Sequence, residues 1–315
     1  MASMYLALGY QCNHHCFFCP CGKNAFKTMQ ASEQELIQAI EMGIQNQNID
    51  QITLSGGEPT LHPSFNRIAA FCIKRGIYVS VLSNGETFYK ESNVQRFFDK
   101  LDPCRIQITT ALHSDEPALH ERVTGVTGSF GRSVQGLKNV MKCGIAVTVK
   151  QVSSRWNYKR LPQFVDFTFG TFGPRVSLTI CGMDFCGMNR EQIEEVAVGY
   201  QQMRPYLEEA LIHVLSIRNN FQGFPRVTVA DLPLCSVDPY YWGFFTKVSR
   251  GEISQYSAPA NSEGHVESSN QIINDCDTYF KACRECHVNS YCPGVWRTAS
   301  QFFEESEVSC VHAVL

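Results

Sequence analysis

The sequence predicts an α/β fold, a partial (β/α)6 barrel of the TIM type over residues 1–215 with a small C-terminal extension over residues 216–315. Three observations predict it: strand and helix patterns alternate six times, polar motifs follow several strand ends, and short strands, turns and cysteines dominate after about residue 215. Alternating strands and helices form parallel sheets, because parallel neighbours need crossover connections. Six units suit an open barrel, whereas a closed one has eight. We place the domain boundary near Leu215–Asn219.

Each element is predicted from its own periodicity. The first helix has Ser32 as N-cap, Glu35 three residues later, and apolar residues at helical spacing. The predicted strands, in chain order, are Tyr5–Tyr10, Ile52–Leu54, Ile77–Leu82, Arg105–Leu112, Ile145–Val152 and Val176–Ile180. The predicted helices are Ser32–Gln45, Phe65–Arg75, Val94–Lys100, Gly131–Cys143, Lys159–Phe169 and Arg190–Val214. Two later segments are predicted to be loops: Asp231–Pro239 and Ser249–Ser269.

The composition argues against several kinds of partner and location. Lys and Arg number 27 and Asp and Glu number 30, so the formal charge is −3 and gives no reason to expect nucleic acid or an anionic membrane as a partner. The sequence has no apolar run of about 18 residues and no signal-peptide pattern at its start. We therefore predict a cytoplasmic protein, in which the 15 cysteines serve as ligands more often than as disulfides.

Most of the cysteines lie in two groups at opposite ends of the chain. The first group comprises Cys12, Cys16, Cys19 and Cys21. The second comprises Cys235, Cys276, Cys283, Cys286 and Cys292. The others have no mutual metal-ligand spacing and are expected to pack as small hydrophobic residues; they are Cys72, Cys104, Cys143, Cys181, Cys186 and Cys310. Two thiol-rich groups indicate two separate metal sites.

The first group has the spacing C-x3-C-x2-C directly after a predicted strand. Three thiolates on one loop can bind three irons of a cubane cluster and leave the fourth iron open. Soft thiolates favour iron–sulfur clusters or zinc over hard cations. Zinc with His14 or His15 as a fourth ligand is the alternative, although such sites more often combine two separated C-x2-C pairs.

With an aromatic residue, Phe18, before its third cysteine, this loop resembles the hallmark of the radical S-adenosylmethionine (SAM) superfamily. In that family the open iron is chelated by the amino and carboxyl groups of SAM, and an electron from the reduced cluster cleaves SAM to methionine and a 5′-deoxyadenosyl radical. The resemblance implies that Cys12, Cys16 and Cys19 are the cluster ligands. Cys21 is then a neighbour, because a fourth thiol ligand would close the open iron.

A second motif of this family follows the next strand. Gly56-Gly57-Glu58-Pro59 resembles its GGEP motif, which holds the amino group of SAM; for a Gly-Gly pair taken alone, an ordinary turn is the alternative. Glycines permit close backbone approach, and carbonyl and carboxylate oxygens suit an ammonium group. The resemblance implies SAM contacts at other strand ends and in the following loop as well, at Ser83, Asn84, Ser114, Arg122 and Gln151. It assigns no residue that acts on the substrate.

The second group, with C-x2-C-x5-C spacing from Cys283 to Cys292, resembles the auxiliary-cluster extension of radical SAM enzymes. This extension is called SPASM when it holds two clusters and twitch when it holds one. The region has too few cysteines for two clusters, so we expect one auxiliary 4Fe–4S cluster bound by Cys235, Cys283, Cys286 and Cys292. Cys276 is the alternative to Cys235, and a four-thiolate zinc ribbon is the alternative to the cluster.

The resemblance implies a radical SAM enzyme of the oxidoreductase or peptide-maturase type. The substrate we expect is a ribosomally made precursor peptide that is oxidised or crosslinked, with the auxiliary cluster taking the electron. A flavodoxin- or ferredoxin-type protein would supply the low-potential electron. Many peptide maturases begin with a leader-binding domain, whereas this chain begins at the barrel strand. Leader recognition then requires a separate protein, unless the substrate lacks a leader.

Two other functions stay open at this point. One is a radical SAM dehydrogenase or rearrangement enzyme for a small molecule, such as an amino sugar or an alcohol, because one-cluster extensions also serve that chemistry. The other is a non-catalytic metal-binding module, which would bind metal without cleaving SAM.

Overall fold

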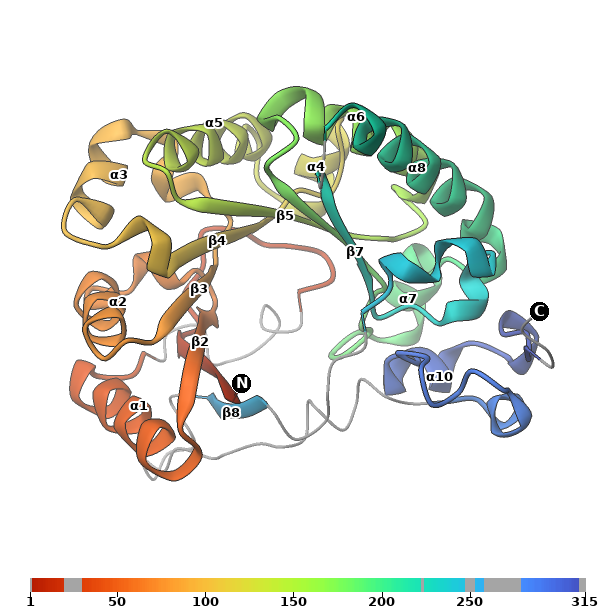
Figure 1. Cartoon of the computed structure of the whole chain (residues 1–315), viewed down its shortest axis with the longest axis horizontal. Coiled ribbons are helices and arrows are strands. Elements are labelled where there is room, and N and C mark those ends of the chain that lie inside the picture. The colour runs from red at the N-terminus through yellow and green to blue at the C-terminus, as the bar shows by residue number, and fades with distance from the viewer. Residues whose placement is uncertain (1, 20–29, 222–223, 247–252, 258–278, 312–315) are drawn as a thin grey trace. The chain divides into compact units, whose positions relative to one another are not determined.

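The structure, a computed structural model, describes residues 2–19, 30–221, 224–246, 253–257 and 279–311 (Figure 1). The chain forms two compact units, each assembled from several segments. The first unit comprises residues 1–111, 121–148 and 250–270, and the second comprises residues 112–120, 149–249 and 271–315. The division into a barrel over residues 1–215 and an extension over residues 216–315 stays a prediction.

The first unit is built on a parallel sheet. Its strands are β1 (Ala2–Gly9), β2 (Ile49–Gly56), β3 (Tyr78–Leu82), β4 (Ile106–Ala111) and β8 (Ile253–Ser257), in the order β4-β3-β2-β1-β8. Its helices are α1 (Glu33–Gln47), α2 (Phe65–Lys74), α3 (Glu91–Phe98) and α5 (Ser129–Lys142), together with the short 3-10 helices η2 (Pro59–Leu61) and η3 (Glu86–Tyr89). Since all the strands run the same way, their carboxyl ends share one edge of the sheet, as the prediction requires.

The second unit pairs β6 (Ser177–Cys181) with β7 (Arg226–Ala230), again in parallel. Its helices are α6 (Leu161–Phe172), α7 (Arg190–Val196), α8 (Tyr200–Asn220) and α10 (Arg297–Phe302). Short 3-10 helices follow the strands: η6 (Leu234–Ser236), η7 (Pro239–Phe244) and η8 (Lys281–Glu285). Strand β5 (Ala146–Val152) and helix α4 (Pro117–Thr124) are divided between the two units.

The six predicted strand–helix units are present, and the predicted α/β class is confirmed. The first helix begins as expected: the backbone N–H of Glu35 donates to Ser32 Oγ at 3.3 Å, and the N–H of Ser32 donates to Glu35 Oε2 at 2.7 Å. These reciprocal bonds satisfy two donors that a helix start leaves without intrahelical partners.

The helix predicted over Arg190–Val214 is instead two helices, α7 and α8, and α8 continues to Asn220. The break lies at Gly199, whose backbone is extended. A Cβ atom at Gly199 would lie 2.4 Å from the Glu307 carboxylate oxygens, so a larger residue there would have to displace that carboxylate from the start of α8. A helical repeat in the sequence does not reveal this contact, because its partner lies about a hundred residues later.

Strand β8 corrects the predicted loop Ser249–Ser269 at residues 253–257, and the rest of that predicted loop lies outside the described residues. Its sequence, Ile-Ser-Gln-Tyr-Ser, has no apolar run, yet it pairs in parallel with β1 at the end of the sheet. Backbone hydrogen bonds make that pairing, so a polar strand suffices at a sheet edge. It leaves β1 between two neighbours, with Leu6 and Leu8 fully buried. Strand β7 and helix α4 were likewise absent from the predicted elements.

Candidate functional site

The first cysteine loop follows β1 and docks on the end of α4. The backbone N–H of His15 donates to Thr124 O at 2.8 Å, and that of Phe17 donates to Val123 O at 2.9 Å. Phe18 is buried, whereas Cys12, Cys16 and Cys19 are half-buried. These backbone bonds fix the loop, so the three thiols are held on one short segment.

The three thiols are close enough to interact electrostatically. Burial raises the pKa of Cys12 to about 11 and that of Cys16 to about 12, with smaller contributions from the Glu58 charge at Cys12 and from neighbouring thiols at both. These two thiols are therefore protonated at neutral pH, and binding of a cluster releases their protons. Three soft donors on one loop fit a cubane that keeps one iron open. Cys21 lies outside the described residues.

The predicted Gly-Gly-Glu-Pro segment touches the backbone that leads into this loop. The N–H of Gly57 donates to Gly9 O, and that of Glu58 donates to Gln11 O, both at 2.8 Å. A Cβ atom at Gly57 would lie 2.3 Å from Gln11 O, and one at Gly56 would lie 2.1 Å from Gly9 O. The two glycines thus bring the end of β2 against the residues just before Cys12.

The carboxylate of Glu58 joins the ends of β2 and β3. It accepts hydrogen bonds from the Thr60 backbone N–H (3.1 Å), Thr60 Oγ1 (2.5 Å), Ser83 Oγ (2.8 Å) and the Asn84 backbone N–H (2.7 Å). Burial raises the pKa of Glu58, and these bonds oppose the rise. The structure therefore brings Glu58, Pro59, Ser83 and Asn84 together beside the first cysteine loop.

The other residues predicted to contact SAM have different surroundings. Ser114 is buried, and its Oγ accepts a bond from the backbone N–H of Glu116 at 3.0 Å. Gln151 is buried and accepts a bond from Ser153 Oγ at 3.0 Å. Arg122 lies exposed on α4. Ser114 and Gln151 belong to the second unit, so their place in a SAM site stays a prediction.

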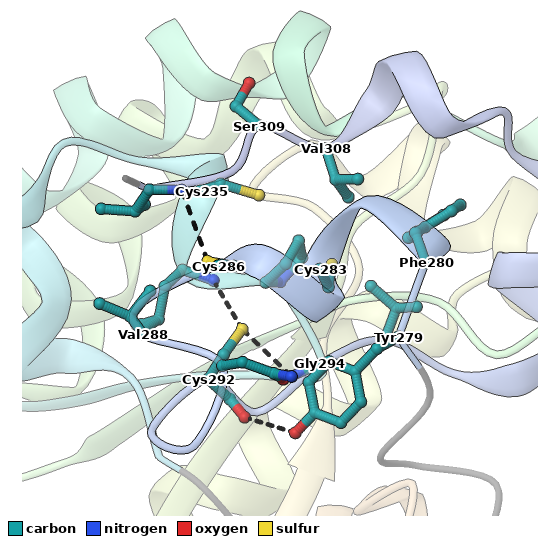
Figure 2. A pocket seen from close by; sticks show the side chains of 15 residues that line it. Cys235, Tyr279, Phe280, Cys283, Cys286, Val288, Cys292, Gly294, Val308 and Ser309 are labelled. Carbon is teal, nitrogen blue, oxygen red and sulfur yellow. Dashed lines mark hydrogen bonds between the residues drawn. The ribbon is translucent and has the colours of Figure 1, made fainter. Parts of the chain in front are cut away.

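The four predicted auxiliary ligands, Cys235, Cys283, Cys286 and Cys292, line one cavity of the second unit (Figure 2). Their segments are separated by about fifty residues, and η6 and η8 carry two of them. Electrostatic interaction links Cys235 to Cys283 and Cys292. Burial raises the pKa of Cys235 to about 11 and also raises that of Cys283. The fold thus gathers the four thiols that the spacing singled out.

Backbone N–H groups point at three of these sulfur atoms. Cys292 Sγ accepts from Leu234 N and Gly294 N, and Cys286 Sγ accepts from Val311 N, each at 3.4 Å. Ser309 donates a backbone hydrogen bond to Cys235. Such bonds stabilise thiolate ligands and tune the potential of iron–sulfur clusters.

An apolar cluster surrounds the same thiols. Leu234, Val288 and Cys292 form its buried part, and Trp242 and Tyr279 pack against it. The hydroxyl of Tyr279 donates to Cys292 O at 2.9 Å, as Figure 2 shows. A four-thiol donor set with N–H···S bonds and an apolar wall fits a 4Fe–4S cluster.

Two further thiols bear on this site. Cys276, the alternative ligand, lies outside the described residues. Cys310 interacts electrostatically with Cys286 and Cys283 and donates its S–H to Ala282 O. Spacing alone left Cys310 among the packing residues. Across the described ranges, no group of three His, Cys, Asp or Glu side chains is arranged to hold a single metal ion.

The sequence did not single out two residues that make polar contacts after strands, Glu86 and Asp231. In the first unit, Glu86 contacts the first cysteine loop. In the second unit, Lys150 of β5 hydrogen-bonds to Cys181 of β6 and interacts with Asp231 after β7. Asp231 has a left-handed backbone (φ 59°), which few non-glycine residues adopt. Their position after strands is the one signal that could have found them.

A family model described as the radical SAM superfamily matches residues 6–154. This range contains the first cysteine loop and the Gly-Gly-Glu-Pro segment whose contacts are described above. Over residues 6–154, just under half of its length, the chain carries a radical SAM domain. Enzymes with this domain use a 4Fe–4S cluster and SAM as cofactors.

Two relatives of this chain are named probable GTP 3′,8-cyclases. The one from Sulfolobus acidocaldarius is 28% identical over 174 residues, which are 53% of this chain and 52% of that protein. The one from Saccharolobus islandicus is 25% identical over 170 residues, 53% of each chain. The match spans about half the length of these relatives.

Solved radical SAM structures share the fold at low identity. SuiB from Streptococcus suis, bound to S-adenosylmethionine, has a TM-score of 0.63 and 12% identity over 98% of this chain and 75% of that chain. The enzyme anSMEcpe with bound AdoMet has a TM-score of 0.59 and 13% identity over 73% of this chain and 62% of that chain. These similarities support the predicted partial barrel.

Of the helices that the structure describes, none is both long and apolar enough to cross a membrane.

Proposed function

We propose that this radical SAM enzyme holds its SAM-binding cluster through Cys12, Cys16 and Cys19 and oxidises a peptide substrate with the help of an auxiliary cluster. When bound and reduced, the first cluster supplies the electron that cleaves SAM to methionine and a 5′-deoxyadenosyl radical. The three thiols of one docked loop, next to the glycines of β2, support this ligand assignment.

The residues around this loop would shape the SAM site. Gly56 and Gly57 leave room for backbone carbonyls to face an ammonium group, while the Glu58 carboxylate is already engaged by four donors. We therefore propose that Glu58 mainly fixes the ends of β2 and β3 relative to each other. Ser83 and Asn84 complete the same hydrogen-bonded corner.

The single observation that carries the oxidative part of the proposal is the gathering of four thiols around one cavity of the second unit. A fully ligated 4Fe–4S cluster there would accept one electron from a substrate radical. With four thiol ligands, none of its irons is left open to bind substrate, so electron transfer is the favoured role.

For the substrate, we propose a ribosomally made peptide. The support is the auxiliary-type cysteine set, which resembles that of peptide maturases, and the similarity in fold to SuiB, a structure of which holds the precursor peptide SuiA. The low-potential electron would come from an external flavodoxin- or ferredoxin-type protein. A separate leader-binding protein belongs to the proposal where the peptide carries a leader.

A second candidate is the cyclisation of GTP, because two relatives that match about half of the chain are named probable GTP 3′,8-cyclases. This candidate rests on about half of each chain. It predicts that GTP alone, added to the reduced and SAM-loaded enzyme, is consumed in step with 5′-deoxyadenosine formation.

The test is anaerobic reconstitution with iron and sulfide, followed by reduction with dithionite in the presence of SAM. We expect roughly eight iron atoms per chain, two cubanes, and formation of 5′-deoxyadenosine. Zinc in place of iron at the second group, or clusters without SAM cleavage, would contradict the proposal. Comparing GTP with a peptide encoded beside this gene, each deuterated, then identifies which one transfers deuterium to 5′-deoxyadenosine.

A further inference from the structure

The short segment between the first two predicted ligands is held by a network of polar side chains. Asn13 Nδ2 donates to Glu86 Oε2 at 2.9 Å, and His14 Nε2 lies 3.0 Å from Glu86 Oε1. Asn84 Nδ2 donates to Asn13 Oδ1 at 2.7 Å. Both residues that directly follow Cys12 therefore contact a single carboxylate.

Glu86 is a buried charge with a cationic partner. Its side chain is 10% exposed, and Arg132 donates to its Oε1 at 2.9 Å. Burial alone would raise the pKa of Glu86, but the bonds from Arg132 and His14 outweigh burial and lower it. The carboxylate is therefore ionised at neutral pH, and removing it would leave a buried imidazole and an amide without their partner.

The backbone places Glu86 at this point. Gly85, with φ +79°, turns the chain after β3, and the N–H of Glu86 donates to Asn84 Oδ1 at 3.0 Å. A Cβ atom at Gly136 of α5 would lie 2.1 Å from Gly85 O, so a helix glycine makes room for the turn. The same Asn84 binds Glu58 through its backbone, which ties this network to the end of β2.

The cysteine loop is thus held on two sides. Its backbone bonds to Val123 and Thr124, and its side chains at Asn13 and His14 bind Glu86. The backbone bonds to α4 fix His15 and Phe17, and the backbone N–H of His14 donates to Cys12 Sγ at 3.3 Å. The side-chain contacts of Asn13 and His14 with Glu86 therefore help to fix the Cys12 thiol relative to Cys16 and Cys19.

We propose that Glu86 is a positioning residue for the SAM-binding cluster, acting through Asn13 and His14 to hold Cys12 in its ligating orientation. The inference rests on the proposed function, because it takes Cys12, Cys16 and Cys19 as the ligands. Glu86 touches neither a predicted ligand sulfur nor SAM in this role. It acts on the loop, as outer-shell residues orient the ligands of other metal sites.

The experiment compares Glu86→Ala and Glu86→Gln with Glu91→Gln in the full-length, reconstituted enzyme. Glu91 pairs with Lys142 on the surface at 2.5 Å, so its variant removes an ion pair from the same region without touching the loop. The readouts are the rate of iron release to a chelator and the fraction of the reduced-cluster EPR signal that changes on addition of SAM. Only a cluster with an open iron gives that change.

We expect Glu86→Ala to release iron from the SAM-responsive cluster about tenfold faster, and Glu91→Gln to behave like the wild type. Glu86→Gln should fall between them, because its amide oxygen still accepts a bond from Asn13. If Glu86→Ala folds poorly, as shown by a lowered midpoint of thermal unfolding, the isosteric Glu86→Gln variant still tests the positioning role of Glu86.

Wild-type iron release and an unchanged EPR response in both Glu86 variants would overturn the inference alone. Equally fast iron release in Glu91→Gln would also overturn the inference, since the effect would then not be specific to Glu86. A wild-type enzyme without any SAM-responsive cluster would instead overturn the proposed function, and this inference with it.

Discussion

The two cysteine groups differ in how the chain holds them. In the first, three thiols lie within the eight residues Cys12–Cys19, on a loop fixed by backbone bonds to α4 and by side-chain bonds to Glu86. In the second, the thiols come from two segments about fifty residues apart and meet in a small apolar cluster with Val288 at its centre. The first site is polar and strand-borne; the second is apolar and borne by short 3-10 helices and loops.

This difference indicates how far the local structure of each site depends on its bound metal. Strand ends and buried hydrogen bonds hold the first loop independently of a cluster. The second region has few regular elements, so metal ligation should contribute much of its stability, as it does in small metal-binding domains. The comparison therefore predicts that losing iron impairs chemistry at the first site and folding at the second.

The largest effect is expected from Cys12→Ala. Removing one of three ligands should abolish 5′-deoxyadenosine formation and lower the iron content by about four atoms per chain. The auxiliary cluster should remain. Cys72→Ala is the control, because Cys72 is buried in α2 and belongs to neither group, and its variant should keep both iron content and SAM cleavage. Retained activity in Cys12→Ala would refute the ligand assignment.

The next effect separates the roles of the thiols in the second region. Cys286→Ala should lose about four iron atoms but still cleave SAM, and amide exchange over residues 279–311 should become faster, as monitored by mass spectrometry. Cys310→Ala should keep the iron, since Cys310 donates its S–H to Ala282 O. If Cys310→Ala loses the cluster while Cys235→Ala keeps it, the fourth ligand is Cys310.

The sequence predicted both thiol sets because ligand spacing within a segment is local information. The cavity gathers the four predicted auxiliary ligands, as their spacing indicated. Glu86 was not predicted, because it lies 73 residues from Asn13 and follows an ordinary turn. The N–H groups of Ser309 and Val311 at the auxiliary thiols were equally invisible, since a backbone donor has no sequence signature.

A substitution in β2 should show how strongly the first loop depends on close packing. A Cβ atom at Gly57 would lie 2.3 Å from Gln11 O, so Gly57→Ala must push the loop away, at a cost of about 1–3 kcal/mol in the free energy of unfolding. Iron loading at the first site should fall with it. Urea unfolding and iron analysis measure both quantities.

The control for this variant is Gly131→Ala. Apart from its chain neighbours and the backbone of its own helix, a Cβ atom at Gly131 of α5 would meet no atom within 4 Å, and alanine favours a helix over glycine by up to about 1 kcal/mol. This variant should be neutral or slightly more stable. A neutral Gly57→Ala would mean that the loop tolerates displacement and is less rigid than the hydrogen bonds indicate.

Contacts between residues far apart in the sequence also limited how much of the fold could be predicted. Six strand–helix units were predictable because each has its own apolar period. Strand β8 was not, because its pairing with β1 is made by backbone groups and its side chains are mostly polar. The break between α7 and α8 was not predictable either, because the apolar period continues across it and the Glu307 contact of Gly199 forms only in the folded chain. Local patterns predicted which elements form but not where each one ends.

The smallest effect concerns Glu305, whose exposed carboxylate caps the 3-10 helix that carries Cys283. Its oxygens accept the backbone N–H groups of Lys281 at 2.9 Å and Ala282 at 3.0 Å, and these bonds lower the pKa of Glu305 below its usual value. A carboxylate with a lowered pKa in the folded state stabilises above the pKa of the unfolded chain, and that contribution is lost as the pH falls through the folded value.

Glu305→Gln should therefore weaken amide protection at Lys281 and Ala282 at pH 7, and the difference from the wild type should shrink as the pH falls through the lowered pKa of Glu305, where the wild-type carboxylate becomes protonated. Protection factors from NMR at several pH values measure this. Glu304→Gln, one residue away, should leave both amides unchanged. Equal protection in Glu305→Gln and the wild type would mean that the apolar cluster and its metal ligands alone hold this helix, which would sharpen the contrast with the hydrogen-bonded first loop.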